Sequence, residues 1–322
     1  MPPSPRAPTP GLPSTAVSAA DPGSEPPGQP EVTDPSGGLG APLLAWYGAH
    51  RRDLPWRAPG TDAWAVLVSE VMLQQTPVSR VLPVYVSWLR RWSTPAALAA
   101  ETPGAAVRAW DRLGYPRRAL RLHAAAVAVT TDHGGRVPTD HDTLLALPGV
   151  GPYTAAAVAA FAAGGRYAVL DTNVRRVLGR VLDGRAHPPA SVSVAERARA
   201  TALLPADGAA AATWSVSLME LGALVCTSRA PRCSDCPLAP ACRWLADGRP
   251  EPGPRRRAQA WVGTDRQVRG LLVAVLRSTR EPVRADELAA VWPDGVQRDR
   301  ALAGLVIDGL AVRDPDGRYR LP

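Results

Sequence analysis

The chain contains no lysine, so all 37 of its basic residues are arginines. A Schiff base with a carbonyl carbon needs a primary amine, and no side chain of this sequence supplies one. No apolar run reaches the roughly 18 residues that a membrane span requires. The N-terminus also lacks the charged start and apolar stretch of a secretory signal. These absences exclude Schiff-base chemistry on a lysine side chain and favour a cytoplasmic protein without a membrane partner.

Cysteine is scarce and confined to one short stretch. The four cysteines are Cys226, Cys233, Cys236 and Cys242, separated by six, two and five residues. Structural zinc sites pair their ligands in two short elbows divided by a longer loop, and only the middle pair here forms such an elbow. A compact loop that gathers four thiolates favours a [4Fe-4S] cluster over zinc. Free or disulfide-bonded cysteines are the remaining alternative.

Acidic residues are outnumbered, with 29 against 37 basic ones, which gives a formal net charge of +8. A basic balance of this size favours a polyanionic partner such as nucleic acid. A high-GC genome is the alternative explanation for so much arginine, because the sequence is also rich in alanine, glycine and proline.

Short helical patterns dominate the chain after a Pro-rich and Ser-rich start at 1–40, which we predict to be disordered. No segment of 41–225 alternates as a strand, so we predict an all-α domain there. Pro, Gly, Ser and Thr mark the helix ends. After a first apolar helical face near Pro42, the predicted helices are 62–75, 78–91, 94–101, 103–113, 116–131, 139–147, 152–163, 172–182, 191–204 and 209–224.

The C-terminal part divides into a cluster loop at 226–245, a linker at 246–262 and a small module at 263–322. In the module, three helical patterns precede a short hairpin, which predicts a winged-helix-like fold. Its third helix carries Arg298 and Arg300. They either contact DNA or are ordinary surface arginines of a structural cap.

Residues 147–151 read Leu-Pro-Gly-Val-Gly and separate two helical patterns. A helix that ends near Leu147 and another that begins at Pro152 would form a helix-hairpin-helix. Gly149 and Gly151 leave backbone N–H groups unshielded beside a helix N-terminus, where an anion such as a DNA phosphate is favoured. Alternatively, these residues only end one helix and begin the next.

Two carboxylates are candidates for acid–base chemistry. Asp171 follows an apolar run, with the amide of Asn173 beside it, although Asp171 could simply cap the next helix. Glu70 lies in an apolar helical segment, where a buried carboxyl is costly unless it is paired or functional. Ser69 and Gln74 are polar neighbours that could hydrogen-bond to it. One protonated and one ionised carboxyl are what cleavage at an acetal-like carbon requires.

Together these motifs make the sequence similar to the endonuclease III superfamily of base-excision DNA glycosylases, and within it to the MutY-type adenine DNA glycosylases. The similarity covers roughly residues 42–245, and the cysteine spacing is its most specific element. Further matches are Leu54-Pro-Trp56, Ser69-Glu-Val-Met-Leu-Gln-Gln-Thr76, Leu113-Gly-Tyr115, Leu147-Pro-Gly-Val-Gly-Pro-Tyr-Thr154, Val169-Leu-Asp-Thr-Asn-Val174 and Leu221-Gly-Ala-Leu-Val-Cys226.

The resemblance implies a monofunctional glycosylase, because this chain has Tyr153 where the lyases of the superfamily have lysine. The substrate would be adenine opposite 8-oxoguanine or guanine in double-stranded DNA, flipped out of the stack, and its removal would initiate base excision repair. Glu70 would protonate the adenine at N7, and Asp171 would stabilise the sugar oxocarbenium ion. Tyr153 and Asn173 would support this site.

DNA contacts and a cofactor also follow from the resemblance. Gln74, Gln75, Leu113 and Tyr115 would fill the base stack and contact the orphaned base. The four cysteines would bind a [4Fe-4S] cluster. Many members carry a Nudix-like domain after the cluster loop, whereas this chain has the short module at 263–322. We expect a bacterial protein that acts as a monomer.

Two other functions stay open. A tyrosine at position 153 also resembles the thymine glycosylases that act on T:G mismatches, so a T:G or U:G mismatch glycosylase is one alternative. The segment 70–75 and Asn173 favour the adenine enzymes. A DNA-binding protein without catalysis is the second alternative, although such a protein would gain by losing two carboxylates that face DNA.

Overall fold

The computed structural model describes residues 36–251 and 261–322, and it confirms the mostly helical fold class. Residues 1–35 of the stretch 1–40 that was predicted to be disordered, and the central part of the predicted linker, 252–260, lie outside the described residues. Before the cysteine loop the elements are α1 (Gly40–His50), η1 (Pro55–Arg57), α2 (Ala63–Leu73), α3 (Val78–Arg91), α4 (Pro95–Ala99), α5 (Pro103–Ala109), α6 (Arg117–Asp132), α7 (His141–Ala146), α8 (Pro152–Ala163), α9 (Thr172–Asp183), α10 (Val194–Ala202) and α11 (Gly208–Leu224).

Side-chain caps set the start of many of these helices. Asp62 accepts a hydrogen bond from the backbone N–H of Ala65 at 2.7 Å, and Asp207 accepts one from Ala210 at 2.8 Å. Such caps satisfy backbone donors that the first helical turn leaves without a partner. They explain why the predicted boundaries of most helices agree with the structure to within about three residues.

Two predicted stretches differ from the structure. The helix predicted at 103–113 ends at Ala109, because Asp111, Gly114 and Tyr115 have positive φ angles of 45°, 81° and 48° that a helix cannot contain. Residues 36–40 also differ from the predicted disorder. Leu39 is buried, and the Ser36 hydroxyl accepts a hydrogen bond from the Gly40 N–H at 2.8 Å.

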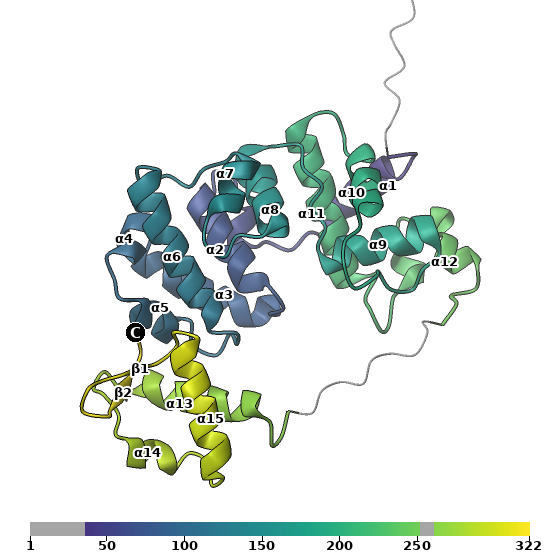
Figure 1. Ribbon diagram of the computed structural model, residues 1–322. Coiled ribbons are helices and arrows are strands. Elements are labelled where there is room, and N and C mark those ends of the chain that lie inside the picture. Colours follow the sequence, from purple (N-terminus) through teal and green to yellow (C-terminus); the bar gives the residue numbers. More distant parts are fainter. Residues whose placement is uncertain (1–35, 252–260) are drawn as a thin grey trace, which may run out of the picture. The chain divides into compact units, whose positions relative to one another are not determined.

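The helices up to α11 form two groups (Figure 1), each packed around a large apolar core, while Ala157, Ala160 and Val169 form a smaller third core. Helices α2 to α8 surround the first, which includes Leu67, Trp88, Trp110 and Leu122. Helices α1, α9, α10 and α11 surround the second, which includes Leu43, Val177, Trp214 and Leu218. Helix α8 contacts α2 and α7 of the first group and α11 of the second. The chain therefore passes from one core to the other immediately after the hairpin.

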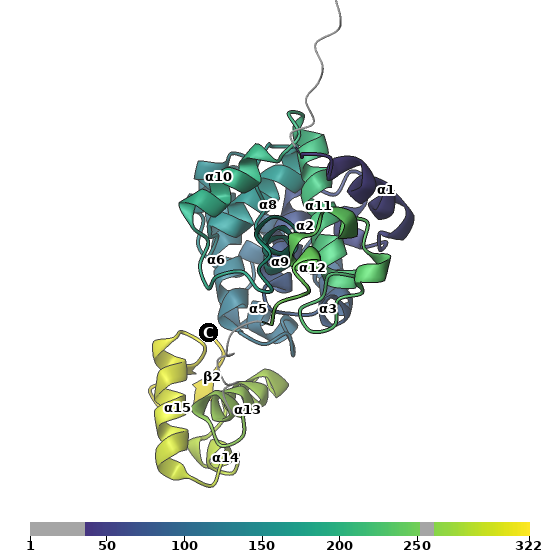
Figure 2. The ribbon, with the colours of Figure 1, turned by 90° about the vertical axis from the view of Figure 1, so that its right-hand side faces the viewer.

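The cysteine loop follows α11 and contains η2 (Cys233–Asp235), η3 (Ala239–Ala241) and α12 (Arg243–Ala246). Figure 2 shows α9 beside α11 and α12, and contacts join α9 to both. The loop thus returns the chain to the helix that Asp171 caps.

The last described segment contains α13 (Asp265–Ser278), α14 (Ala285–Ala289) and α15 (Gly295–Ile307), then the strands β1 (Val312–Arg313) and β2 (Tyr319–Arg320). The strands pair antiparallel, with Val312 opposite Arg320. Arg300 forms an ion pair with Asp265 at 2.7 Å, and Arg298 forms one with Asp299 at 3.1 Å. These partners favour the interpretation of both arginines as ordinary surface residues.

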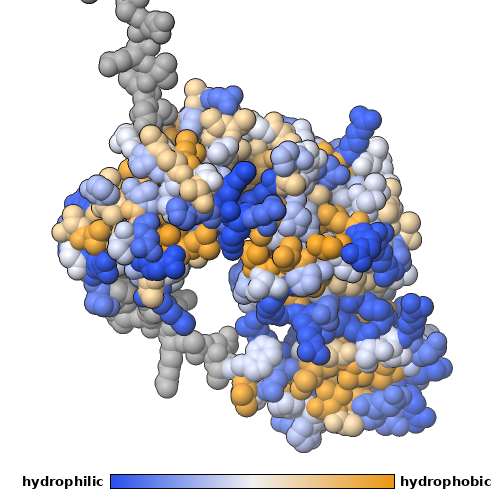
Figure 3. Space-filling model, turned by 180° about the vertical axis from the view of Figure 1, so that it is seen from behind, coloured by the Kyte–Doolittle hydropathy of each residue, from blue (hydrophilic) through white to orange (hydrophobic). Residues whose placement is uncertain are grey.

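The surface mixes hydrophilic and hydrophobic patches on the face that Figure 3 draws. Among the described helices, none combines the length and apolar character that crossing a bilayer demands.

Candidate active site

The predicted hairpin joins α7 to α8. Leu147 ends the first helix, the Val150 N–H donates to the Leu147 carbonyl at 3.1 Å, and Gly151 caps the second. Gly149 has φ +77°, and a Cβ there would lie 2.6 Å from the Cβ of Arg121 on α6. A side chain at this position would be strained and would also clash, so the turn requires glycine. Gly149 is exposed and Gly151 is half-buried, beside the N-terminus of α8.

Glu70 lies on the inner side of α2 and is only 5% exposed. The Tyr153 hydroxyl at the start of α8 donates a hydrogen bond to Glu70 Oε2 at 2.7 Å. The prediction that Ser69 and Gln74 hydrogen-bond to Glu70 is wrong. The Ser69 hydroxyl donates to the Val66 carbonyl, and the Gln74 amide donates to the Thr154 hydroxyl. A serine inside a helix reaches its own previous turn more easily than the next side chain.

The surroundings of Glu70 favour a protonated carboxyl near neutral pH. Burial raises the pKa of Glu70 to about 7, helped by the negative charge of Asp171 and opposed by the Tyr153 hydrogen bond and the charge of Arg57. Burial likewise raises the pKa of Tyr153 well above 10, and the two carboxylates raise it further. Tyr153 therefore stays a neutral donor, while Glu70 can hold or release a proton.

Asp171 both caps a helix and faces the site. Its Oδ1 accepts from the Val174 N–H at 2.6 Å, so the capping interpretation is correct for one oxygen. The Asn173 amide donates to Oδ2 at 2.7 Å. Burial raises the pKa of Asp171, while these two donors and the charge of Arg176 oppose the rise. The donors favour the carboxylate over the neutral acid.

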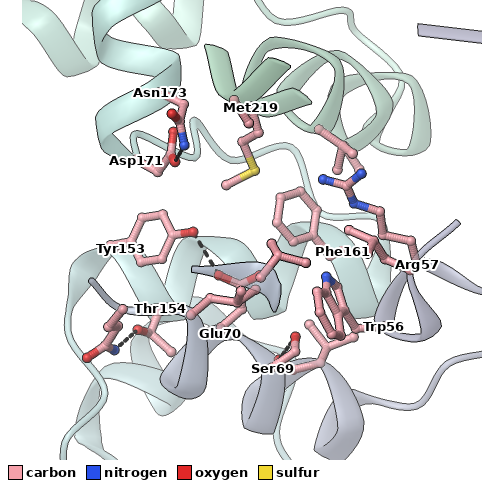
Figure 4. A pocket seen from close by; sticks show the side chains of 18 of the residues that line it. Trp56, Arg57, Ser69, Glu70, Tyr153, Thr154, Phe161, Asp171, Asn173 and Met219 are labelled. Carbon is pink, nitrogen blue, oxygen red and sulfur yellow. Dashed lines mark hydrogen bonds between the residues drawn. The ribbon is translucent and has the colours of Figure 1, made fainter. Parts of the chain in front are cut away.

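One cleft of about 1590 Å³ contains both acids. In Figure 4, Glu70 from α2 and Tyr153 from α8 lie on one side, and Asp171 and Asn173 at the start of α9 lie on the other. Met219 of α11 also lines this cleft. The structure thus brings together four residues whose sequence positions span more than a hundred residues. A buried acid and a buried carboxylate facing one cavity suit hydrolysis of a glycosidic bond.

Comparison with known proteins gives the family. Residues 68–199 match the HhH-GPD superfamily of base excision DNA repair proteins. The adenine DNA glycosylase of Mycolicibacterium smegmatis is 54% identical over 280 residues, which cover 87% of this chain and 94% of that protein. The chain belongs to the adenine DNA glycosylases of the HhH-GPD superfamily. The expected family, base-excision role and enzyme class are thereby confirmed.

Further similar proteins agree with this assignment. The adenine DNA glycosylase of Mycobacterium tuberculosis is 52% identical over 296 residues, covering 91% of this chain and 97% of that protein. A solved thermostable thymine-DNA glycosylase has a TM-score of 0.58 at 28% identity, covering 64% of this chain and 94% of that chain. The glycosylase therefore shares its fold with the thymine enzyme and much more of its sequence with the adenine enzymes.

A buried cluster of ion pairs beside the two acids was not predicted from the sequence. Glu220 on α11 is fully buried, and its carboxylate accepts hydrogen bonds from Arg52 and Arg57 at 2.7 to 2.9 Å. Burial would raise the pKa of Glu220, but the two guanidinium groups hold it below its usual value. Both arginines line the cleft. The available signal was a single acid in an apolar helix, the same signal that identified Glu70.

The four residues expected to enter DNA are placed differently from one another. Gln75 is exposed with φ +54°, and Tyr115 is 45% exposed with φ +48°. Gln74 is half-buried and bonded to Thr154. Leu113 is only 3% exposed, so its side chain belongs to the core and does not protrude. Of these four residues, Gln75 and Tyr115 are therefore the exposed ones, and the Tyr115 hydroxyl accepts a hydrogen bond from Arg266 of α13 at 3.0 Å.

All four cysteines line one small apolar cavity that also touches Arg180 and Trp244. Within the described ranges, no three Cys, His, Asp or Glu side chains are arranged to hold a single metal ion. Four thiols that line one shared apolar cavity are suited to bind a metal centre through their thiolates. Arg180 adds positive charge, because its Nη1 donates to Cys226 Sγ at 3.2 Å.

Hydrogen bonds connect this cavity to the cleft. Arg176 on α9 donates from Nε to the Cys226 carbonyl at 2.8 Å and from Nη2 to Asn173 Oδ1 at 2.8 Å. Asn173 in turn donates to Asp171. The conformation of the cysteine loop is therefore linked, through two side chains, to the carboxylate in the cleft.

Proposed function

We propose that the glycosylase removes adenine opposite 8-oxoguanine or guanine by hydrolysis, without cleaving the strand. The observation that carries this proposal is the pair Glu70 and Asp171 in one cleft, with Tyr153 hydrogen-bonded to the acid. Tyr153 cannot form a Schiff base, and the sequence offers no lysine in its place. Hydrolysis is then the route left to the carboxyl pair.

The reaction begins with the transfer of a proton from Glu70 to N7 of the flipped adenine. The bond between C1′ and N9 then breaks, and its electron pair leaves with the neutral base. The ionised Asp171 stabilises the oxocarbenium ion that remains on the sugar. Water adds at C1′ and returns a proton to Glu70, which restores the acid. Asn173 and the Val174 N–H keep Asp171 oriented toward the cleft.

The DNA duplex is held and opened by residues around the cleft. The hairpin N–H groups near Gly149 and Gly151 bind a backbone phosphate at the N-terminus of α8. Gln75 and Tyr115 enter the stack and fill the space left by the flipped adenine. Gln74 supports its neighbour Gln75 through its own hydrogen bond to Thr154.

The four cysteines hold a [4Fe-4S] cluster. Their common apolar cavity and the neighbouring Arg180 support this assignment. When bound, the cluster cross-links the loop that follows α11 and takes no part in breaking the glycosidic bond. Through Arg176, the cross-linked loop fixes Asn173 and so the carboxylate of Asp171.

A panel of duplexes tests this function. Each duplex carries one A:8-oxoguanine, A:G, T:G or U:G pair, and released bases are identified by mass spectrometry. Release of adenine from the first two duplexes supports the proposal. Thymine or uracil release alone would instead assign the mismatch function suggested by Tyr153, and tight binding without release would leave a DNA-binding protein.

The rate of adenine excision should fall as pH rises through about 7. Glu70 must carry a proton to act as the acid, and its protonated fraction drops above its pKa of about 7. At low pH the rate should fall again as Asp171 gains a proton. This fall should begin at a higher pH than for an ordinary aspartate, because the pKa of Asp171 is raised. Single-turnover rates with saturating enzyme measure this profile. A constant rate between about pH 6 and about pH 9 would contradict the role of Glu70.

Replacing Cys236 with Ser should remove the cluster. The purified protein should contain about four iron and four sulfide ions per chain, and the variant should contain almost none. The variant should also bind DNA and excise adenine poorly, because the loop loses its cross-link. One zinc ion per chain in the unaltered protein would show that the cluster assignment is wrong.

A further inference from the structure

Arg118, the second residue of α6, is a buried arginine whose partners are neutral. It is only 7% exposed. Across the described ranges no carboxylate forms an ion pair with it, and its guanidinium bonds instead to carbonyl and hydroxyl oxygens. Burial lowers the pKa of Arg118 to about 10, so it still carries its charge at neutral pH. A buried charge is costly, which makes its set of partners informative.

One half of the guanidinium closes the end of α2. Nη1 donates to the carbonyls of Val71 and Met72 at 3.0 and 3.2 Å, and also to the carbonyl of Gln74. The last carbonyls of a helix have no partner within the helix, and a cation is favoured at that end. Arg118 therefore fixes the point where the chain leaves α2 toward Gln75.

The other half holds the loop between α5 and α6. Nη2 donates to the carbonyls of Leu113 and Gly114 at 3.5 and 3.1 Å, and to the Thr76 hydroxyl at 3.0 Å. Thr76 in turn donates to the Leu113 carbonyl at 3.4 Å. One side chain thus joins two loops that are about forty residues apart in the sequence.

These two loops carry Gln75 and Tyr115, the exposed residues that the proposed function places in the base stack. Gln75 and Tyr115 both have left-handed backbone conformations, with φ of 54° and 48°. Such conformations cost free energy in residues other than glycine, and they persist only where the surroundings impose them. The Arg118 guanidinium also lies 5.4 Å from the centre of the Tyr115 ring.

We propose that Arg118 is a positioning residue for base flipping, which holds Gln75 and Tyr115 together at the spacing that a duplex requires. It acts through these loops and does not touch the adenine. This inference rests on the proposed function, in which Gln75 and Tyr115 enter the base stack.

A double-mutant cycle tests the inference. Arg118→Met and Tyr115→Ala are made singly and together, and the single-turnover rate of adenine excision is measured for each. Each single change should lower the rate about tenfold or more, and the double variant should be hardly slower than the slower single one, because both remove the same contact with DNA. Arg118→Lys keeps the charge but has too few fixed donors to span both loops, so it should restore only part of the rate.

Val129→Ala is the matched control, since Val129 is fully buried near the other end of α6. This change should destabilise the fold but leave the excision rate per folded molecule unchanged. In the double variant Val129→Ala/Tyr115→Ala, the fold-losses in rate of the two single variants should multiply. Hydrogen exchange at 73–76 and 113–115 should rise in Arg118→Met and Arg118→Lys but not in the control. Arg118→Lys keeps this readout available should Arg118→Met fail to fold.

Two results would overturn the inference in different ways. Multiplicative losses for Arg118→Met and Tyr115→Ala would show that Arg118 does not act through the Tyr115 loop, while the proposed function would stand. Full activity of Tyr115→Ala would remove the proposed role of Tyr115 in the stack, and the role of Arg118 would fall with it.

Discussion

Glu70→Gln should lower the rate of adenine excision by about 10³-fold or more while leaving the affinity for the duplex nearly unchanged. Glutamine has the same size and can still accept the Tyr153 hydrogen bond. It cannot transfer a proton to N7, so the adenine would have to leave as an anion. Single-turnover excision and equilibrium binding to an A:8-oxoguanine duplex, measured on the same preparation, separate the two effects.

The control for this prediction is Glu281→Gln, the same chemical change at an exposed position between α13 and α14. It should leave both excision and binding unchanged. If Glu70→Gln retained more than about a tenth of the rate, the acid would have to be another group, because such a loss is far below that expected for general acid catalysis.

Asp171→Asn should lower the rate by about 10²-fold to 10³-fold, because the oxocarbenium ion loses the negative charge that faces it. Thermal stability should change little, since asparagine caps a helix about as well as aspartate. The Val174 N–H would keep its acceptor. The measurement is single-turnover excision together with the unfolding temperature of the variant.

Asp207→Asn provides a matched control for Asp171. Asp207 caps α11 through a bond from the Ala210 N–H, so this variant makes the same substitution at the same kind of position. It should excise adenine at the unaltered rate. Product formation by Asp171→Asn at a rate equal to that of Asp207→Asn would reduce Asp171 to a structural cap and refute the mechanism.

Much of the fold could be predicted because the determining features are local. Proline, glycine and capping residues ended the predicted helices close to their true positions, and the hairpin at Gly149 and Gly151 follows from five adjacent residues. Glu70 could be selected because an acid in an apolar helix is costly without a purpose. Its companion Asp171 followed from its place between an apolar run and a helix.

Features that depend on packing between distant segments could not be predicted. Arg57 reaches Glu220 across 163 residues of sequence, and although an acid in an apolar helix marks Glu220, nothing in the sequence identifies Arg57 as its partner. Leu113 is apolar and lies three residues after the buried Trp110, so the sequence alone does not say whether it faces the core or the DNA. Arg118 resembled any other surface arginine until its six oxygen partners were brought around it by α2 and the loop before α6.

The most direct test of the account is the fate of the DNA strand after the base is lost. A duplex with one A:8-oxoguanine pair is incubated with the glycosylase, and free adenine and strand breaks are quantified with and without hot alkali and with borohydride present. We predict that adenine is released in full, that breaks appear only after alkali, and that borohydride traps no covalent complex. Strand cleavage without alkali, or a trapped complex, would contradict hydrolysis by the Glu70 and Asp171 pair.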